Sequence, residues 1–160
     1  MTYNGNNSFV RETVKGLNYV KKGDVNNIIS DLSETDKVLS IKETEIGRDM
    51  YNPYNNTVYY NPQSGLETKD DNDALTSQIQ SSALGLLHEI GHGFIDFFFS
   101  NKEKRYLEKK DRDYTNEEEK FVIDNIETRA AEILGEPSRT NHDGRPIKAK
   151  DSISRELEDK

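Results

Sequence analysis

The pentapeptide His88-Glu89-Ile90-Gly91-His92 has the H-E-x-x-H pattern and contains two of the three histidines in the chain. Residues four apart on an α-helix lie on one face, about 6 Å from each other, so both imidazoles can bind one metal ion. Glu89 follows the first histidine, where its carboxylate can accept a proton from a water molecule on that ion. The motif therefore predicts metal-dependent hydrolysis, provided that this segment is helical.

An amphipathic pattern over residues 73–99 predicts the required helix. Three aspartates precede it (Asp70, Asp71 and Asp73), as expected near the positive end of a helix dipole. The alternative is a core helix with two hydrogen-bonded histidines, but such a helix gains nothing from this spacing. At 100° per residue, the apolar positions form one stripe: Ile79, Ala83, Leu87, Ile90, Phe94, Phe97 and Phe98.

A catalytic zinc ion usually has three protein ligands, so one ligand must come from outside the motif. Asp96 is close in sequence, but it lies eight residues after His88, about 12 Å along a straight helix. We therefore expect Asp96 either to orient His92 or to form a structural ion pair.

A second helix, predicted from Asn116 to Gly135, offers a better third ligand. Thr115 or Asn116 caps its start, and acidic residues fill its first turn. Glu127 lies in the middle of its apolar side, where carboxylates are rare unless they have a partner. We predict Glu127 as the third metal ligand; the alternative is a partly exposed Glu127 paired with Arg129 or a lysine.

These features together resemble the NleD-like effector metallopeptidases. That family consists of bacterial zinc endopeptidases injected into host cells, and related domains form the C-termini of large polymorphic toxins. The resemblance covers roughly residues 38–144. It rests on the H-E-I-G-H motif, the helical Glu127, the segment Leu-Gly-Glu-Pro-Ser-Arg-Thr at 134–140 and the stretch before the active-site helix at 50–62.

The resemblance implies an α+β, zincin-like fold, with a small mixed or antiparallel sheet beside the active-site helix. It implies one Zn²⁺ per chain, held by His88, His92 and Glu127, with Glu89 activating water. The developing oxyanion needs a second stabiliser. Arg139 and His142 are the candidates for this catalytic role, ahead of Tyr114. Arg139 could instead pair with Glu136, and His142 is the first alternative ligand if Glu127 does not bind the metal.

Patterns elsewhere predict a scaffold for this site. Residues 10–22 and 25–32 read as short amphipathic helices, and residues 37–42 and 57–60 as strands. The strand at 57–60 is the candidate for the sheet edge that pairs with extended substrate, or for the neighbour of that edge. Residues 101–113 read as a charged, solvated connector.

The length of 160 residues predicts one domain over 1–160, with a core at roughly 9–147 and a tail or short terminal helix at 148–160. The absence of cysteine excludes disulfides and thiolate zinc sites. A net charge of -8 argues against a nucleic-acid partner, and no apolar run is long enough for a membrane.

The sequence thus predicts a zinc endopeptidase that hydrolyses an intracellular target protein, such as a host or competitor signalling protein. The N-terminus lacks the features of a signal peptide, so we expect a soluble protein secreted or translocated without a cleaved signal, or a domain cut from a larger toxin. We expect a monomer, and an immunity protein as a possible partner. The alternatives are a catalytically inactive, zinc-stabilised interaction domain and a metal-free helical module.

Overall fold

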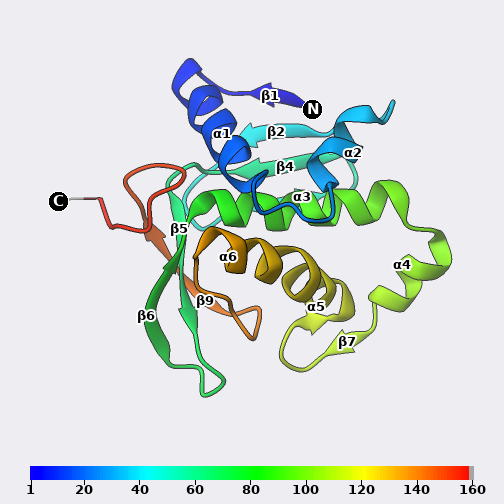
Figure 1. Cartoon of the computed structure of the whole chain (residues 1–160). Coiled ribbons are helices and arrows are strands. Elements are labelled where there is room, and N and C mark those ends of the chain that lie inside the picture. The colour runs from blue at the N-terminus through cyan, green and yellow to red at the C-terminus, as the bar shows by residue number, and fades with distance from the viewer. Residues whose placement is uncertain (159–160) are drawn as a thin grey trace.

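The computed structural model describes residues 1–158 and shows a mixed α+β fold with small sheets. Figure 1 labels most of its elements. In chain order they are β1 (Thr2–Asn4), α1 (Asn7–Val20), α2 (Ile28–Glu34), β2 (Ser40–Glu43), β3 (Met50–Asn52), β4 (Thr57–Tyr60), β5 (Ser64–Lys69), β6 (Leu75–Gln80), α3 (Ser82–Phe98), α4 (Asn101–Leu107), β7 (Lys110–Asp111), β8 (Thr115–Asn116), α5 (Glu117–Val122), the π-helical turn η1 (Ile123–Glu127), α6 (Thr128–Leu134) and β9 (Gly144–Lys148).

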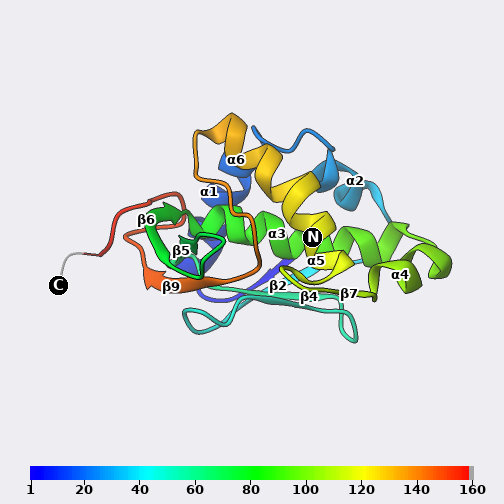
Figure 2. The ribbon, with the colours of Figure 1, turned by 90° about the horizontal axis from the view of Figure 1, so that it is seen from below.

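Helix α3 carries the H-E-x-x-H motif and runs through the middle of the molecule (Figure 1). Seen from below, it lies between the sheet containing β2 and β4 and the helices α1 and α6 (Figure 2). It contacts β4 as well as α1 and η1, so several of its faces are covered. This explains why the apolar stripe is broad: Ala83, Leu87 and Ile90 have no exposed surface. The predicted helix is confirmed for residues 82–98.

The beginning of that prediction was wrong, because residues 75–80 form strand β6. This strand pairs with β5 in an antiparallel hairpin. Asp70 accepts hydrogen bonds from the backbone N–H groups of Asn72 and Ala74, so it stabilises the hairpin turn rather than a helix start. Helix α3 is capped by Ser81 instead, whose side chain accepts a hydrogen bond from the Leu84 N–H.

The four-stranded sheet has the order β1-β2-β4-β3. The predicted strand at 57–60 is confirmed as β4, where Val58 and Tyr60 are fully buried. Strand β4 pairs with β2 in parallel and with β3 in antiparallel orientation. The sheet edge near the motif is therefore β3, the neighbour of β4, and β3 contacts α3 directly.

The predicted second helix is continuous through α5, η1 and α6. Asn116 caps it by accepting a hydrogen bond from the Glu119 N–H, and Gly135 ends it with a left-handed φ of 69°. The π-helical turn in its middle was not predicted. This helix approaches α3 closely at Gly91, where an added Cβ would lie 2.9 Å from Ile126 Cδ1 and 3.1 Å from Val122 Cγ1. Glycine at this position therefore lets the two helices meet.

Two other segments differ from the predictions. The connector at 101–113 contains α4, which begins with a reciprocal capping box between Ser100 and Glu103. Residues 149–158, which were expected to form a tail, fold back onto the domain. Ala149 and Ser152 are fully buried, and the Ser152 carbonyl accepts a hydrogen bond of 2.8 Å from the Ala83 N–H. This contact anchors the first turn of α3. Residues 159 and 160 of that predicted tail lie outside the described residues.

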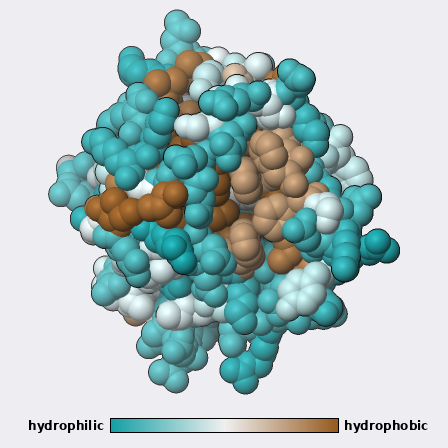
Figure 3. All heavy atoms as spheres, turned by 45° about the vertical axis from the view of Figure 1, so that its right-hand side comes forward, coloured by the Kyte–Doolittle hydropathy of each residue, from teal (hydrophilic) through white to brown (hydrophobic). Residues whose placement is uncertain are grey.

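Aromatic side chains gather at the C-terminal end of α3. Phe94 stacks against Phe98 and Phe99, and Phe99 contacts Phe121 of α5. Figure 3, which turns this side of the molecule forward, shows an apolar area within a mainly hydrophilic surface. Over residues 1–158, none of the helices combines the length and the apolar character that crossing a bilayer requires.

Candidate metal centre

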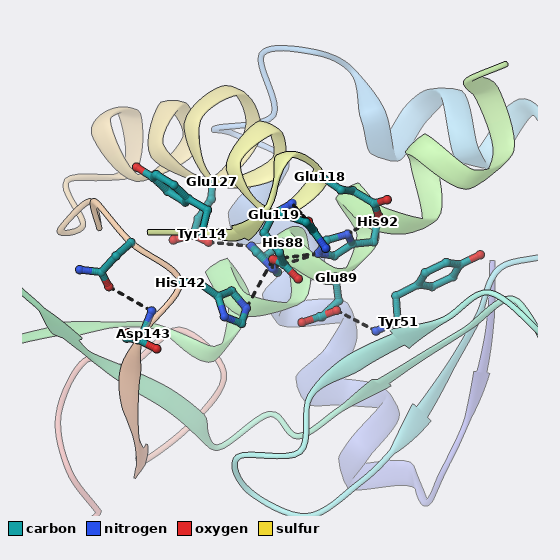
Figure 4. A network of polar contacts seen from close by, with 12 residues as sticks. Tyr51, His88, Glu89, His92, Tyr114, Glu118, Glu119, Glu127, His142 and Asp143 are labelled. Atoms are coloured by element: carbon teal, nitrogen blue, oxygen red, sulfur yellow. Dashed lines mark hydrogen bonds and ion pairs between the residues drawn. The ribbon is translucent and has the colours of Figure 1, made fainter. Parts of the chain in front are cut away.

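The Nε2 atoms of the two motif histidines converge on a carboxylate of the second helix (Figure 4). They lie 3.2 Å from each other, and Glu119 Oε2 lies 3.2 Å from His88 Nε2 and 3.4 Å from His92 Nε2. The ligand atoms of a tetrahedral site with bonds of ~2.0–2.1 Å are ~3.3 Å apart. The three atoms therefore have the spacing of ligands on one face of a metal tetrahedron.

Glu119 has the environment of a candidate metal ligand. Its Oε2 is buried and makes no hydrogen bond of regular geometry, although it lies 3.2–3.4 Å from imidazole nitrogens of His88, His92 and His142. Burial tends to raise the pKa of this carboxyl, but the imidazoles of His88 and His92 outweigh burial and hold the pKa well below its usual range. Two neutral imidazoles and one carboxylate form a donor set that suits a divalent ion.

Glu127, the predicted third ligand, lies on the other side of His88. Its Oε2 is 2.9 Å from His88 Nδ1, whereas the ligand positions are at Nε2. Arg139 donates to both carboxylate oxygens, with Nε 2.8 Å from Oε1 and Nη2 2.6 Å from Oε2, and Gln80 donates to Oε1. The hydrogen-bonding capacity of Glu127 is thus already used, and Glu119 replaces it as the candidate third ligand.

Glu127 and Arg139 instead determine the state of His88. Arg139 Nη2 is 3.2 Å from His88 Nδ1. When Nδ1 carries a proton, both nitrogens are donors, so they cannot form a hydrogen bond with each other. The shorter contact to Glu127 is therefore the hydrogen bond, with Nδ1–H as the donor. In the neutral ring this proton on Nδ1 leaves Nε2, which faces Glu119, as the nitrogen available to a metal ion. Burial opposes the charge on Glu127, but Arg139 holds its pKa well below the usual range.

His92 is oriented in the same way by Glu118, whose Oε1 is 2.7 Å from His92 Nδ1. Burial lowers the pKa of His92, but the carboxylates of Glu118 and Glu119 outweigh it and raise the pKa to about 10. Asp96, the alternative partner considered for His92, accepts hydrogen bonds from Tyr51 and Lys104. Its role is therefore the structural ion pair.

Glu89 lies at the wall of a cavity of about 970 Å³ that also includes His92, Glu119 and His142. One of its oxygens accepts a hydrogen bond of 2.7 Å from the Tyr51 N–H of edge strand β3 (Figure 4). The other oxygen has no hydrogen bond among the described contacts of residues 1–158. The cavity thus places a carboxylate, held by the backbone of β3, beside the metal position.

His142 also reaches the cluster. Its Nε2 is 3.4 Å from Glu119 Oε2, and the ligand atoms of His88, Glu119 and His142 all lie within 4.8 Å of one another, a group that could hold a metal ion. Burial lowers the pKa of His142. Arg139 does not line the cavity, and Tyr114 lines a different hollow. Of the three proposed oxyanion stabilisers, only His142 lies at the cavity.

Glu119 was overlooked because it belongs to the acidic run at 117–119, which fits the positive end of a helix. A signal was nevertheless present. Counted from Glu119, positions three, four, seven and eight residues later are Val122, Ile123, Ile126 and Glu127, and all four are buried. Glu119 therefore begins the stripe that faces α3, and Glu127 ends it.

Comparisons with known proteins add no family to this description: no family profile matches the chain, and no curated protein or solved structure is significantly similar to it.

Proposed function

We propose that this chain is a zinc-dependent endopeptidase whose metal ligands are His88, His92 and Glu119. The observation that carries the proposal is the approach of these three side chains to the spacing of a tetrahedral site, with Glu89 beside them in a cavity. The resemblance of the sequence to NleD-like metallopeptidases supports the same class and a zincin-like fold.

The donor set favours zinc among the divalent ions. Mg²⁺ and Ca²⁺ prefer oxygen ligands, whereas two imidazoles with one carboxylate are a common catalytic zinc set. A zinc ion bound here would lower the pKa of a water molecule and polarise the scissile carbonyl group. Three ligands leave one position for these reactants.

Each remaining step falls to a side chain of this protein. Glu89 accepts the proton of the attacking water through its free oxygen and then donates that proton to the leaving amine. The Tyr51 N–H fixes the Glu89 carboxylate during both transfers. Glu127 and Glu118 keep the Nδ1 atoms of the two motif histidines occupied, so both Nε2 atoms remain available.

The substrate we propose is an extended segment of a protein. The cavity is open enough for a peptide and is bordered by edge strand β3, whose Met50 and Tyr51 line it. Strand edges bind extended peptides through main-chain hydrogen bonds. A host or competitor protein inside a target cell is the substrate that the family resemblance favours, which would make the chain an effector or toxin domain.

The test begins with zinc per chain by elemental analysis after purification without chelator. We expect one zinc per chain in the wild type and in Glu89→Gln. We then expect the substitution to reduce peptide cleavage by roughly 10²–10⁴-fold, the usual contribution of a general base. Cleavage is measured by labelling new N-termini in a cell lysate.

Glu132→Gln, which removes an exposed carboxylate from α6, is the matched control and should cleave like the wild type. A chain that takes up no zinc would overturn the metal site. Zinc binding without cleavage by the wild type would instead identify a zinc-stabilised interaction domain, and equal cleavage by the wild type and Glu89→Gln would contradict the role assigned to Glu89.

A further inference from the structure

His142 occupies a position that three metal ligands alone do not explain. Its Nε2 faces Glu119 Oε2 at 3.4 Å, close to the ~3.3 Å between ligand atoms of a tetrahedral zinc site. The imidazole of His142 lies 6.4 Å from that of His88, centre to centre. In Figure 4 it approaches the cluster from the side opposite to Glu118. One ligand atom each of His142, Glu119 and His88 lie within 4.8 Å of one another, so His142 reaches the same cluster.

The segment that carries His142 differs from the elements that carry the other three side chains. His88, His92 and Glu119 belong to helices, but residues 135–143 form neither helix nor strand. His142 is held by two backbone contacts: its N–H donates to the Asp113 carbonyl at 3.1 Å, and its carbonyl accepts from Arg139 Nη1 at 3.1 Å. Its side chain is 42% exposed, against 4% for His88 and 10% for His92. His142 can thus leave the cluster without disturbing the core.

We propose that His142 is a displaceable fourth ligand, which completes the coordination of the ion at rest and leaves when water and substrate enter. This inference rests on the proposed metal site. It differs from the role of oxyanion stabiliser that the sequence predicted for His142, because a stabiliser hydrogen-bonds to substrate and does not bind the ion. The side chain is neutral and has an available Nε2 lone pair whenever it acts as a ligand.

Arg139 gives this arrangement a physical link to the remaining ligands. The same guanidinium that donates to Glu127, and so supports the tautomer of His88, also donates to the His142 carbonyl. The buried side chain of Arg139 therefore helps to position both His142, on the loop, and His88, on helix α3. Because Arg139 belongs to the same loop, His142 can be displaced without breaking the Arg139–Glu127 pair if its side chain moves and the loop backbone stays in place.

The chain offers a direct test because it has only three histidines, and all three belong to the cluster. The full chain is prepared with nitrogen-labelled histidine and loaded with one equivalent of cadmium, a spectroscopic substitute for zinc. NMR couplings between cadmium and imidazole nitrogen then count the bound histidines. We expect three coupled imidazoles in the wild type and two in His142→Ala.

Adding acetohydroxamate, a small metal-binding compound, should remove the coupling of His142 and keep the couplings of His88 and His92. Couplings in the wild type from His88 and His92 but not His142, without the compound, would overturn the inference and leave the proposed metal site intact. Three couplings that persist with the hydroxamate bound would make His142 a permanent ligand, which contradicts displacement. A chain that binds no cadmium and no zinc would overturn the proposed function itself. His142→Ala is not needed for this decision, since the wild-type count alone separates the outcomes.

Discussion

Two carboxylates of the same helix, those of Glu127 and Glu119, each contact one nitrogen of the His88 imidazole, and the two carboxylates differ in their hydrogen-bond partners. Glu127, at the Nδ1 side of His88, is 1% exposed and receives hydrogen bonds from Arg139 and Gln80. Glu119, at the Nε2 side, has a buried oxygen without a hydrogen bond. The first carboxylate is satisfied by the protein alone, whereas the second is not.

This difference distinguishes a carboxylate that orients a metal-binding histidine from a carboxylate that can bind the ion itself. All lone pairs of the Glu127 carboxylate are used by protein donors, so Glu127 can orient His88. To bind an ion, Glu127 would have to release Arg139, which would then be buried without a charge partner. A carboxylate that faces only imidazole nitrogens is stabilised once a cation replaces their protons. Glu119 and Glu127 should therefore respond differently to substitution.

The largest effect is expected for Glu119→Ala on zinc affinity. Losing one of three protein ligands should weaken binding roughly 10³-fold, because the binding free energy of a zinc site is shared among few ligands. Glu127→Gln, which removes no metal ligand but weakens the orientation of His88, should weaken binding roughly 10–100-fold. Competition with a chelating dye measures both values, with Glu117→Ala as the control from the same helical turn. A greater loss for Glu127→Gln than for Glu119→Ala would return the ligand role to Glu127.

The order reverses for the stability of the metal-free protein. Glu127→Ala leaves Arg139, which is 9% exposed, without its charge partner, and breaking such a buried pair costs about 3–5 kcal/mol. Glu119→Ala should change stability less, since its charge contacts are with His88 and His92, which can release their protons when the carboxylate is removed. Urea unfolding gives both free energies. The apolar pair Glu127→Leu with Arg139→Met should recover most of the loss. Equal destabilisation by the two alanine variants would remove the distinction.

The cluster of His88, His92 and Glu119 should also release protons when zinc binds. Glu118 and Glu119 overcome the effect of burial and raise the pKa of His92 from 6.5 to about 10, so the metal-free protein binds that proton at pH 7. Zinc must displace it, and calorimetry in buffers of different ionisation enthalpy should detect about one proton from His92. Without metal, this raised pKa stabilises the fold fully below pH 6.5, and the contribution is lost as pH rises towards 10. Zinc binding without proton release would contradict the charge assigned to His92.

The last effect, a slope of stability with pH, concerns another carboxyl at the cavity, that of Asp49. Burial raises its pKa from 3.8 to about 8, despite a hydrogen bond from the Asn61 N–H. Because the folded state holds this proton more tightly than the unfolded state, stability should fall as pH rises from about 4 to 8, by at most ~1.4 kcal/mol per pH unit. Asp49→Asn should flatten that slope and stabilise the protein at pH 8. Parallel stability curves for the two proteins would show that Asp49 ionises normally.

Patterns among residues close in sequence predicted most of the helices and strands that position the site, including the helix that carries the H-E-x-x-H motif. The strand at 57–60, the cap at Asn116 and the stop at Gly135 were all predicted, because each depends on residues close in sequence. Residues 75–80 were misassigned because their apolar positions also fit a helix. Only pairing with β5, a tertiary contact, makes them a strand.

The site was predicted in part for a related reason. His88, Glu89 and His92 are encoded within five residues, whereas the choice between Glu119 and Glu127 depends on how one helix crosses another. Both carboxylates lie on the stripe that faces α3. What decides their roles is the position of Arg139, which reaches Glu127 from a loop twelve residues later. That contact has no local signature in the sequence.

The π-helical turn at 123–127 makes the spacing between the two carboxylates sensitive to chain length. Such a turn holds one residue more than the α-helical turn it replaces, so deleting one residue there would allow a regular α-helix. Because the extra residue is absorbed within that turn, the helix beyond it would keep nearly the same orientation relative to Glu119. An insertion between residues 119 and 127 would instead rotate Glu127 by about 100° and break its pairing with His88, so this helix should tolerate a one-residue deletion better than a one-residue insertion.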